Sequence, residues 1–202
     1  MRKEKQQSVA EFVETALMLA MEKRDRNTKA HCERVKRLST RIGISMNLEN
    51  TDIYVLQSAA ALHDLGKINI PDSILFKPSP LDQSEWTIMR THAAGGAEMV
   101  EISKIEHAET IAKIIRHHHE RLDGSGYPDG LKGKNIPLLS RIISVADSYD
   151  AISMHRHYSG ATPHASALEI MRSERGTKLD PDVLDVFEDV VNSGSLSTGS
   201  ML

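Results

Sequence analysis

The sequence predicts an all-α protein built as one helical domain, on three observations. Its 202 residues, 40% hydrophobic content and net charge of −3 are ordinary for a single globular domain. Strand signals are nearly absent: apolar and polar residues nowhere alternate over a long stretch, no Asn-Gly turn occurs, and aromatic residues make up only 4% of the chain. Apolar residues instead recur every three or four positions along most of the chain, as they do on one face of a helix.

The first half of the chain contains four expected helices. Residues 8–23, 28–38 and 52–65 each carry apolar side chains at helical spacing. Gly66 stands where the third of these helices would end, because glycine is favoured just beyond a helix C-terminus. An Asp-x-x-Glu capping box opens the fourth helix, which is expected over residues 82–100.

The second half continues in the same way. Residues 107–119 are expected to form a helix, and the loop over residues 121–137 that follows is rich in Gly, Pro, Asp and Lys. Pro137 ends this loop as a good first helical residue and opens a helix to about residue 154. Two last helices are expected to begin at Thr162-Pro163 and at Asp180-Pro181, because each pair joins an N-cap residue to a proline.

We divide the chain after residues 24 and 192. Residues 1–24 are an N-terminal helix or linker, residues 25–192 are the domain, and residues 193–202, rich in Ser and Gly, are a flexible tail. The apolar face of the first helix fits packing against its own domain, a linker from another domain, or a contact in a homodimer. The sequence leaves these three explanations open.

Composition excludes several classes of protein. No apolar run approaches the roughly 18–20 residues that a membrane span needs, and the N-terminus lacks the apolar core of a signal peptide. Cys32 is the only cysteine, so no intrachain disulfide can form, and we expect a cytoplasmic protein. The weakly acidic charge argues against a polynucleotide-binding protein, which usually presents a strongly basic face.

The residues that carry chemistry are histidines and aspartates on several helices. His63 and Asp64 are adjacent, so both reach one ion only if it lies across their shared edge. His31 and His92 are single histidines, which are more often structural than ligating. Asp147 interrupts an apolar run, and a carboxylate beside a buried face needs a cation or hydrogen-bond donors. Each signal is weak by itself.

Taken together, these residues predict a dinuclear metal site. Helical bundles build such sites from histidine and carboxylate side chains that converge from separate helices. Nitrogen and oxygen ligands without a thiolate suit iron, manganese or zinc. Two ions bridged by a carboxylate can bind a phosphate and lower the pKa of a water between them, which indicates hydrolysis of a phosphoester.

Two motifs resemble the signatures of a known family. Residues 63–67, HDLGK, resemble the HD-x-G-K signature of the HD-GYP family, a branch of the HD phosphohydrolases. Residues 118–128, HHERLDGSGYP, resemble its second signature, HHE-x-x-DG-x-GYP. The similarity extends over residues 28–187 with the family's segments in order. It implies an HD-domain helical bundle with a metal site in its core.

The resemblance also implies a ligand set for two divalent ions, iron or manganese in the first place and zinc, magnesium or nickel as alternatives. Asp64 would bridge the two ions. Beside Asp64, the ligands would be His31, His63 and Asp147 for the first ion and His92, His118 and His119 for the second. His117 precedes this pair of histidines, and we expect it to be exposed at a helix end rather than to bind metal.

The same resemblance assigns roles around the metals. Asp64 and Lys67 would be catalytic, with the Lys67 ammonium beside the scissile phosphate, where a cation favours the developing charge. Substrate contacts would come from Lys67, Arg156 and Tyr127. Tyr127 lies in the Gly126-Tyr127-Pro128 loop, which is associated in the family with docking to diguanylate cyclases (GGDEF proteins).

From its own residues, this loop has two explanations. Gly124 and Gly126 permit backbone angles that other residues resist, and Pro128 restricts the exit, so the segment is a structural turn that holds the neighbouring histidines. Alternatively, it presents Tyr127 to a substrate or to a partner protein. The two explanations are compatible.

Two positions depart from the family's pattern. Trinuclear members carry a glutamate four residues before the first histidine ligand, where this chain has Asn27, so two metals are expected. The family commonly has a second cation three residues after the position of Arg156, where this chain has Ser159. Ser159 therefore leaves the affinity for cyclic di-GMP and the choice of nucleotide open.

The characterised members of this family hydrolyse cyclic di-GMP. The resemblance thus implies a metal-dependent phosphodiesterase in which a metal-bridged hydroxide opens cyclic di-GMP to linear pGpG, with further cleavage to GMP as an option. Two alternatives remain. One is a weakly active or inactive module that binds nucleotide or diguanylate cyclase partners, which Ser159 motivates. The other is a phosphodiesterase for another cyclic dinucleotide. The complete set of ligand positions argues for an active enzyme.

Overall fold

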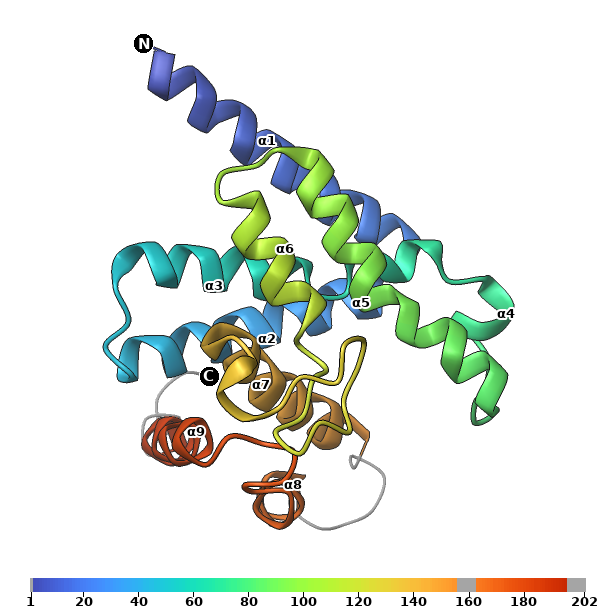
Figure 1. Ribbon diagram of the computed structural model, residues 1–202, viewed down its shortest axis with the longest axis vertical. Helices are drawn as coiled ribbons and strands as arrows, with labels where there is room; N and C mark the ends of the chain where they lie inside the picture. Colours follow the sequence, from blue (N-terminus) through green and yellow to red (C-terminus); the bar gives the residue numbers. More distant parts are fainter. Residues whose placement is uncertain (1, 156–162, 196–202) are drawn as a thin grey trace.

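The predicted all-α fold is confirmed by the computed structural model, which describes residues 2–155 and 163–195 (Figure 1). Every regular element in this part of the chain is a helix. In chain order the helices are α1 (Arg2–Arg24), α2 (Arg26–Ser45), α3 (Asn50–Leu62), the 3₁₀ helix η1 (Leu65–Asn69), α4 (Asp72–Leu75), α5 (Gln83–Ser103), α6 (Ala108–Arg116), the 3₁₀ helix η2 (Gly133–Asn135), α7 (Leu138–His155), α8 (Pro163–Ser173) and α9 (Pro181–Ser195).

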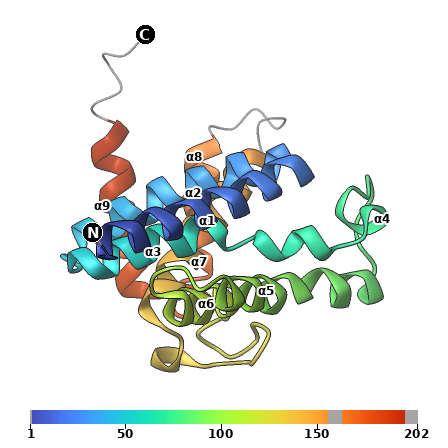
Figure 2. The same cartoon turned by 90° about the horizontal axis from the view of Figure 1, so that it is seen from above.

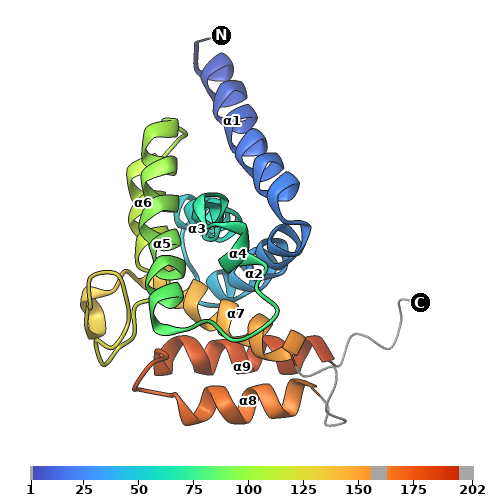
Figure 3. The same cartoon turned by 90° about the vertical axis from the view of Figure 1, so that its right-hand side faces the viewer.

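The helices pack around α2 and α3, which run antiparallel through the middle of the bundle (Figures 1 and 3). The antiparallel pair α5 and α6 covers one side of α3, and α1 lies along the other side of the bundle (Figure 2). Helix α7 packs against α2, and α8 and α9 pack against α7 in turn. None of the helices in the described ranges is both long and apolar enough to cross a membrane.

One hydrophobic core joins these helices. Among its fully buried side chains are Leu56 of α3, Ile115 of α6, Ile142 of α7 and Phe187 of α9. Burial of a side chain of this size contributes about 1.5–3 kcal/mol to the stability of the fold. The core therefore holds α3, α6 and α7 in fixed positions, and these helices carry or border the polar residues described below.

Helix α1 packs against the domain through its C-terminal half. Met21 is buried in the core, and Val13 and Leu17 pack against it, whereas Phe12 and Leu19 on the other face are exposed. The apolar face of α1 is thus used at least in part for packing within the chain, which was one of the three explanations left open by the sequence.

Several helix ends are formed by the expected residues. Asp82 accepts hydrogen bonds from the backbone N–H groups of Ser84 and Glu85 at 2.8 and 3.0 Å, and the Glu85 carboxylate accepts one from the backbone N–H of Asp82 at 2.8 Å. The predicted capping box is therefore confirmed. Asp180 likewise accepts from the backbone N–H groups of Asp182 and Val183 at the start of α9.

Other boundaries differ from expectation. Helix α2 begins two residues early, at Arg26, because Asp25 caps it by accepting from the backbone N–H of Asn27 at 2.9 Å. Helix α9 continues to Ser195, past our division at residue 192, and the Ser193 hydroxyl donates to the Asp189 carbonyl at 2.7 Å. Residues 196–202 of the predicted tail lie outside the described residues.

The expectation that Gly66 ends the third helix was wrong. Helix α3 ends at Leu62, and Gly66 lies inside η1. A Cβ atom at residue 66 would lie 2.0 Å from the backbone oxygen of His92 and 2.6 Å from the backbone nitrogen of Gly96. Glycine is needed at this position because η1 and α5 approach each other with no space for a side chain. Gly96 belongs to the same contact, because a Cβ atom there would lie 2.9 Å from the backbone nitrogen of Gly66.

We predict that Gly66→Ala lowers the free energy of unfolding by at least ~2 kcal/mol, because the added methyl group meets backbone atoms that cannot move separately. Gly95→Ala is the matched control. A Cβ atom at residue 95 meets only the Asn69 side chain, at 3.9 Å, so this variant should gain about 0.5–1 kcal/mol by removing a glycine from a helix. Urea denaturation measures both values, and equal effects of the two variants would contradict the prediction.

Candidate metal centre

The structure brings the seven predicted ligand positions together, although they come from five separate segments. His31 lies on α2, His92 on α5 and Asp147 on α7, whereas the others lie in short turns after α3 and after α6. Two groups form, and within each group the ligand atoms lie within 4.8 Å of one another. The groups are His31, His63 and Asp64, and His92, His118 and His119.

Asp64 lies between the two groups. Its Oδ2 atom is 3.6 Å from Nε2 of His63 and 3.8 Å from Nε2 of His31, whereas its Oδ1 atom is 3.4 Å from Nε2 of His92. The two oxygens of this carboxylate thus face different groups of imidazoles, as a bridging ligand requires.

Asp147 closes the other side of the cluster. Its Oδ1 atom is 3.0 Å from Nε2 of His31 and 4.0 Å from Nε2 of His63, and its Oδ2 atom is 4.0 Å from Nδ1 of His119. This carboxylate therefore faces the first group with one oxygen and His119 of the second group with the other.

Backbone carbonyl groups orient three of the histidines. His63, His92 and His118 each donate a hydrogen bond from Nδ1 to the carbonyl oxygen three residues earlier in the chain, at 2.8, 2.8 and 2.6 Å respectively. Because a carbonyl can only accept, the ring proton is on Nδ1 and the lone pair is on Nε2. All three rings therefore present the Nε2 lone pair to the centre of the cluster.

These three Nε2 atoms are buried and have no hydrogen-bond partner among the described residues. Buried polar atoms of this kind are rare and costly unless something satisfies them. Lone pairs of neutral imidazoles arranged next to two carboxylates match the ligands that divalent ions of the first transition series prefer. The residues present therefore fit a metal site.

The charge states of the cluster agree with this interpretation. Burial lowers the pKa of His92 and, with help from neighbouring imidazoles, keeps the pKa of His118 well below its usual value, so both rings stay neutral. Burial by itself would raise the pKa of Asp64, but Lys67 and the surrounding histidines hold it well below its usual value. Lys67 donates to Oδ2 of Asp64 at 2.6 Å.

Asp150 is a residue of the centre that the sequence interpretation gave no metal-site role. It accepts a hydrogen bond from Nδ1 of His31 at 2.7 Å and bonds from Nε and Nη2 of Arg34 at 2.7 and 2.8 Å. Burial disfavours the charged His31 ring, but the hydrogen bonds from it to Asp147 and Asp150 outweigh burial and raise its pKa to about 9. The sequence contained a signal for this role: Asp150 follows Asp147 by three residues on one helix, and residues at that spacing share a helix face.

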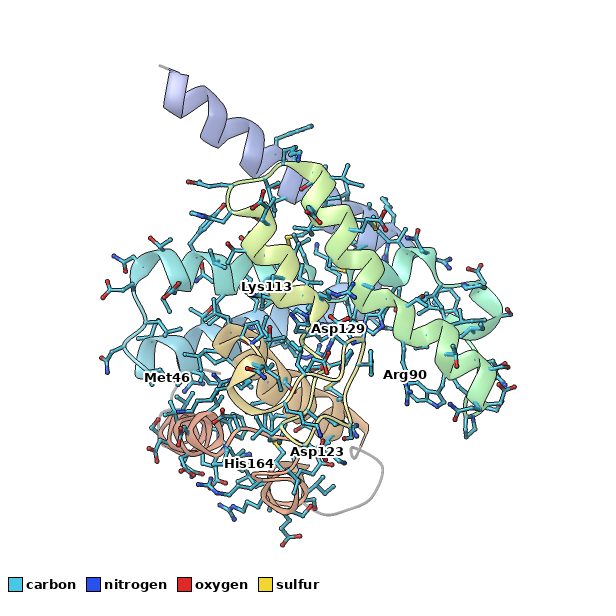
Figure 4. The ribbon with its side chains drawn as sticks, in the orientation of Figure 1. Met46, Arg90, Lys113, Asp123, Asp129 and His164 are labelled. Atoms are coloured by element: carbon cyan, nitrogen blue, oxygen red, sulfur yellow. The ribbon has the colours of Figure 1, made fainter. Side chains whose placement is uncertain are left out.

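The expectation that His117 is exposed was wrong. Its ring is buried, and Nε2 lies 2.9 Å from a carboxylate oxygen of Asp129, which also accepts two bonds from Arg116 at 2.8 and 2.7 Å. The expected helix over residues 107–119 ends at Arg116 instead, so the three histidines follow it in a turn. Figure 4 shows Asp129 in the loop next to the end of α6.

Glu120 attaches the same loop from inside. It is 2% exposed and accepts bonds from the backbone N–H groups of Asp129 and Leu131 at 2.7 and 3.1 Å. A Cβ atom at Gly126 would lie 2.4 Å from the Arg121 backbone nitrogen, so this glycine allows the loop to pack directly on the turn that carries His119. These contacts support the structural explanation of the loop.

Tyr127 is half-buried and faces the cluster. Its ring centroid is 4.8 Å from that of His119, and the guanidinium carbon of Arg90 lies 5.4 Å from the same Tyr127 centroid. Together with the ligand residues it borders a cleft of about 1120 Å³, large enough for a dinucleotide-sized ligand. Among the residues that line this cleft are Asn27, Lys67, Trp86, Arg90, Arg121 and Tyr127. Arg156 and Ser159 lie outside the described residues.

Comparison with known proteins agrees with this geometry. The family model described as "HD domain" matches residues 14–183. A Xanthomonas campestris protein named "Cyclic di-GMP phosphodiesterase response regulator RpfG" is 40% identical over 85% of this chain and 45% of its own length. A Vibrio cholerae protein named "3'3'-cGAMP-specific phosphodiesterase 2" is 36% identical over 83% of this chain and 32% of its own.

Among solved structures, a cyclic GMP-AMP-specific phosphodiesterase of Vibrio cholerae, V-cGAP3, shares the fold with a TM-score of 0.69 at 21% identity, over 95% of this chain and 50% of that one. This chain belongs to the HD-domain family, and the resemblance to its HD-GYP branch is confirmed. It spans less than half the length of the two curated relatives.

We predict that Glu120→Gln loosens the loop, because an amide leaves only one oxygen for the two backbone N–H groups. Loss of one such bond costs about 1–3 kcal/mol, so amide hydrogen exchange at Asp129 and Leu131 should become at least about 10-fold faster. Glu98→Gln, an exposed position on α5, is the control and should leave these rates unchanged. Mass spectrometry of deuterated peptides measures these exchange rates. Unaltered exchange in Glu120→Gln would show that Glu120 does not hold the loop in place.

Proposed function

We propose that this chain hydrolyses the phosphodiester bonds of cyclic di-GMP in the cytoplasm, giving pGpG and, by a second cut, GMP. The observation that carries the proposal is the position of Asp64, whose two oxygens face two groups of imidazoles beside the cleft. The name of the Xanthomonas relative supports the choice of substrate.

The proposed ligands are those expected from the sequence. His31, His63 and Asp147 would hold one ion, and His92, His118 and His119 the other, with Asp64 shared. When bound, two ions supply Lewis acidity to a phosphoryl oxygen and lower the pKa of a water between them. Iron or manganese suits this donor set best, with zinc, magnesium or nickel as alternatives.

Lys67 has two tasks in this proposal. It balances the buried Asp64 carboxylate through the 2.6 Å contact, and it lines the cleft, where its ammonium can approach a phosphate oxygen of the substrate. A fixed cation at that place stabilises the charge that develops on phosphorus-bound oxygens. Tyr127 would contact the substrate beside His119, and Arg156 remains a proposed substrate contact.

The number of ions is proposed to be two. Asn27 precedes His31 by four residues on α2, so the two side chains share a helix face, and both line the cleft. A carboxylate at residue 27 would add a ligand for a third ion, whereas the amide is a poor replacement.

One alternative substrate has support of its own. The Vibrio relative is named for 3'3'-cGAMP, so this mixed cyclic dinucleotide is the second candidate. A binding module without activity is disfavoured by the complete set of ligand positions. Docking of a diguanylate cyclase would use the outer side of the Gly126-Tyr127-Pro128 loop, where Pro128 is exposed, because Tyr127 faces the cleft.

Asp64→Asn should lower kcat/KM for cyclic di-GMP by at least ~10²-fold, because the charge shared between the two ions is lost. Metal analysis of the purified variant should show fewer ions per chain than the wild type. Asp52→Asn, an exposed position on α3, should change neither quantity. Wild-type protein that holds manganese or iron and leaves cyclic di-GMP intact would refute the proposed function.

Asn27→Glu should raise the number of manganese ions bound per chain from about two to about three, because it places a carboxylate one helical turn from His31. Calorimetric titration of metal-free protein with Mn²⁺ gives the count. Asn50→Glu adds the same charge at the exposed start of α3 and should leave the count at about two. A count that does not differ between the two variants would contradict this assignment.

A further inference from the structure

The wall of the cleft formed by α4 and α5 is not explained by the metal centre. It is lined by Leu75, Leu81, Gln83, Trp86, Met89 and Arg90. Trp86 keeps 44% of its surface exposed, although its neighbours in the wall are largely apolar. An aromatic ring held open at the edge of a polar cleft is the arrangement with which proteins stack nucleobases.

Arg90 lies one helical turn after Trp86, on the same face of α5. Its guanidinium is 5.4 Å from the centroid of the Tyr127 ring, which positions it by a cation–π contact. Figure 4 shows Arg90 on the side of α5 that faces α7 and the loop after α6.

Arg90 differs from two other cations of the cleft, Arg34 and Lys67, in its charge balance. Arg34 is paired with Asp150, and Lys67 is paired with Asp64. Arg90 forms no ion pair or hydrogen bond with any residue in the described ranges. Its five N–H donors are therefore available to a ligand beside His119, the residue on which Tyr127 packs.

We propose that this wall is a guanine-binding subsite, in which the base stacks on Trp86 and Arg90 donates two hydrogen bonds to its O6 and N7 atoms. Guanine presents two acceptors on this edge, whereas adenine presents one acceptor and an amino donor that an arginine cannot accept. The subsite makes guanine-containing cyclic dinucleotides the preferred ligands over cyclic di-AMP. This inference rests on the proposed function, because it takes the cleft to hold a cyclic dinucleotide.

Trp86 is the only tryptophan of the chain, so its fluorescence reports directly on the subsite. The first experiment titrates the metal-free full chain, kept in EDTA, with cyclic di-GMP, 3'3'-cGAMP and cyclic di-AMP. Cyclic di-GMP and 3'3'-cGAMP should quench the emission with a Kd at least about 10-fold lower than that of cyclic di-AMP. Absence of quenching, or equal Kd values for the three nucleotides, would overturn the proposal.

Two variants then test the role of Arg90. Arg90→Ala should weaken cyclic di-GMP binding by about 10-fold and remove most of the preference over cyclic di-AMP. Arg90→Lys keeps the charge but not the planar fork, so it should lose the preference as well. Arg37→Ala removes an exposed arginine of α2 outside the cleft and should bind like the wild type. If Arg90→Ala still prefers cyclic di-GMP to cyclic di-AMP, Arg90 does not recognise guanine.

Turnover by manganese-loaded protein separates this inference from the proposed function. The selectivity is the kcat/KM for cyclic di-GMP divided by the kcat/KM for cyclic di-AMP. If the wild type cleaves cyclic di-GMP and Arg90→Ala has the same selectivity as the wild type, only the proposed subsite is wrong. If guanine-selective quenching occurs and depends on Arg90 while no nucleotide is cleaved, the subsite stands and the proposed hydrolysis fails.

Discussion

The structure depends on one buried carboxylate, Asp64. A charged group with 2% of its surface exposed is stable only if cations and hydrogen-bond donors surround it. Lys67 supplies one charge from η1, and imidazoles approach the two oxygens from α2, from α5 and from the turn after α3. The bundle can place them there because η1 and α5 meet at Gly66 and Gly96 without an intervening side chain. The close contact between the backbones of η1 and α5 thus also allows the buried charge of Asp64 to be balanced.

Hydrogen bonds to backbone carbonyl groups orient three of the candidate ligands. The last carbonyl groups of a helix have no partner within the helix. Those of α3 and α6 accept the Nδ1–H groups of His63 and His118, which therefore turn their Nε2 atoms inward. His92 donates the same kind of bond to the Met89 carbonyl inside α5, because a carbonyl oxygen has a second lone pair that the helix does not use. All three Nε2 atoms are thus directed by a carbonyl three residues earlier, whether or not a helix ends there.

The loop after this turn joins the metal centre to the cleft. Glu120 and Asp129 attach it to the end of α6, and Tyr127 then lies between His119 and Arg90. One short segment therefore supports the candidate ligands with its backbone and borders the cleft with a side chain. The contacts of the Gly126-Tyr127-Pro128 loop support its structural explanation, and the position of Tyr127 at the cleft is compatible with the second one.

The sequence by itself determined the helical class and the capping box at Asp82, because periodicity and caps are local and are read within a few residues. The seven candidate ligands followed from the resemblance of the chain to a family, because single histidines and aspartates give only a weak signal. The sequence did not determine that Asp150 orients His31, that His117 is buried against Asp129, or that Gly66 is a contact rather than a helix end. Those features depend on distances between segments far apart in the chain, or on where a helix stops. Only the packing of the helices decides them.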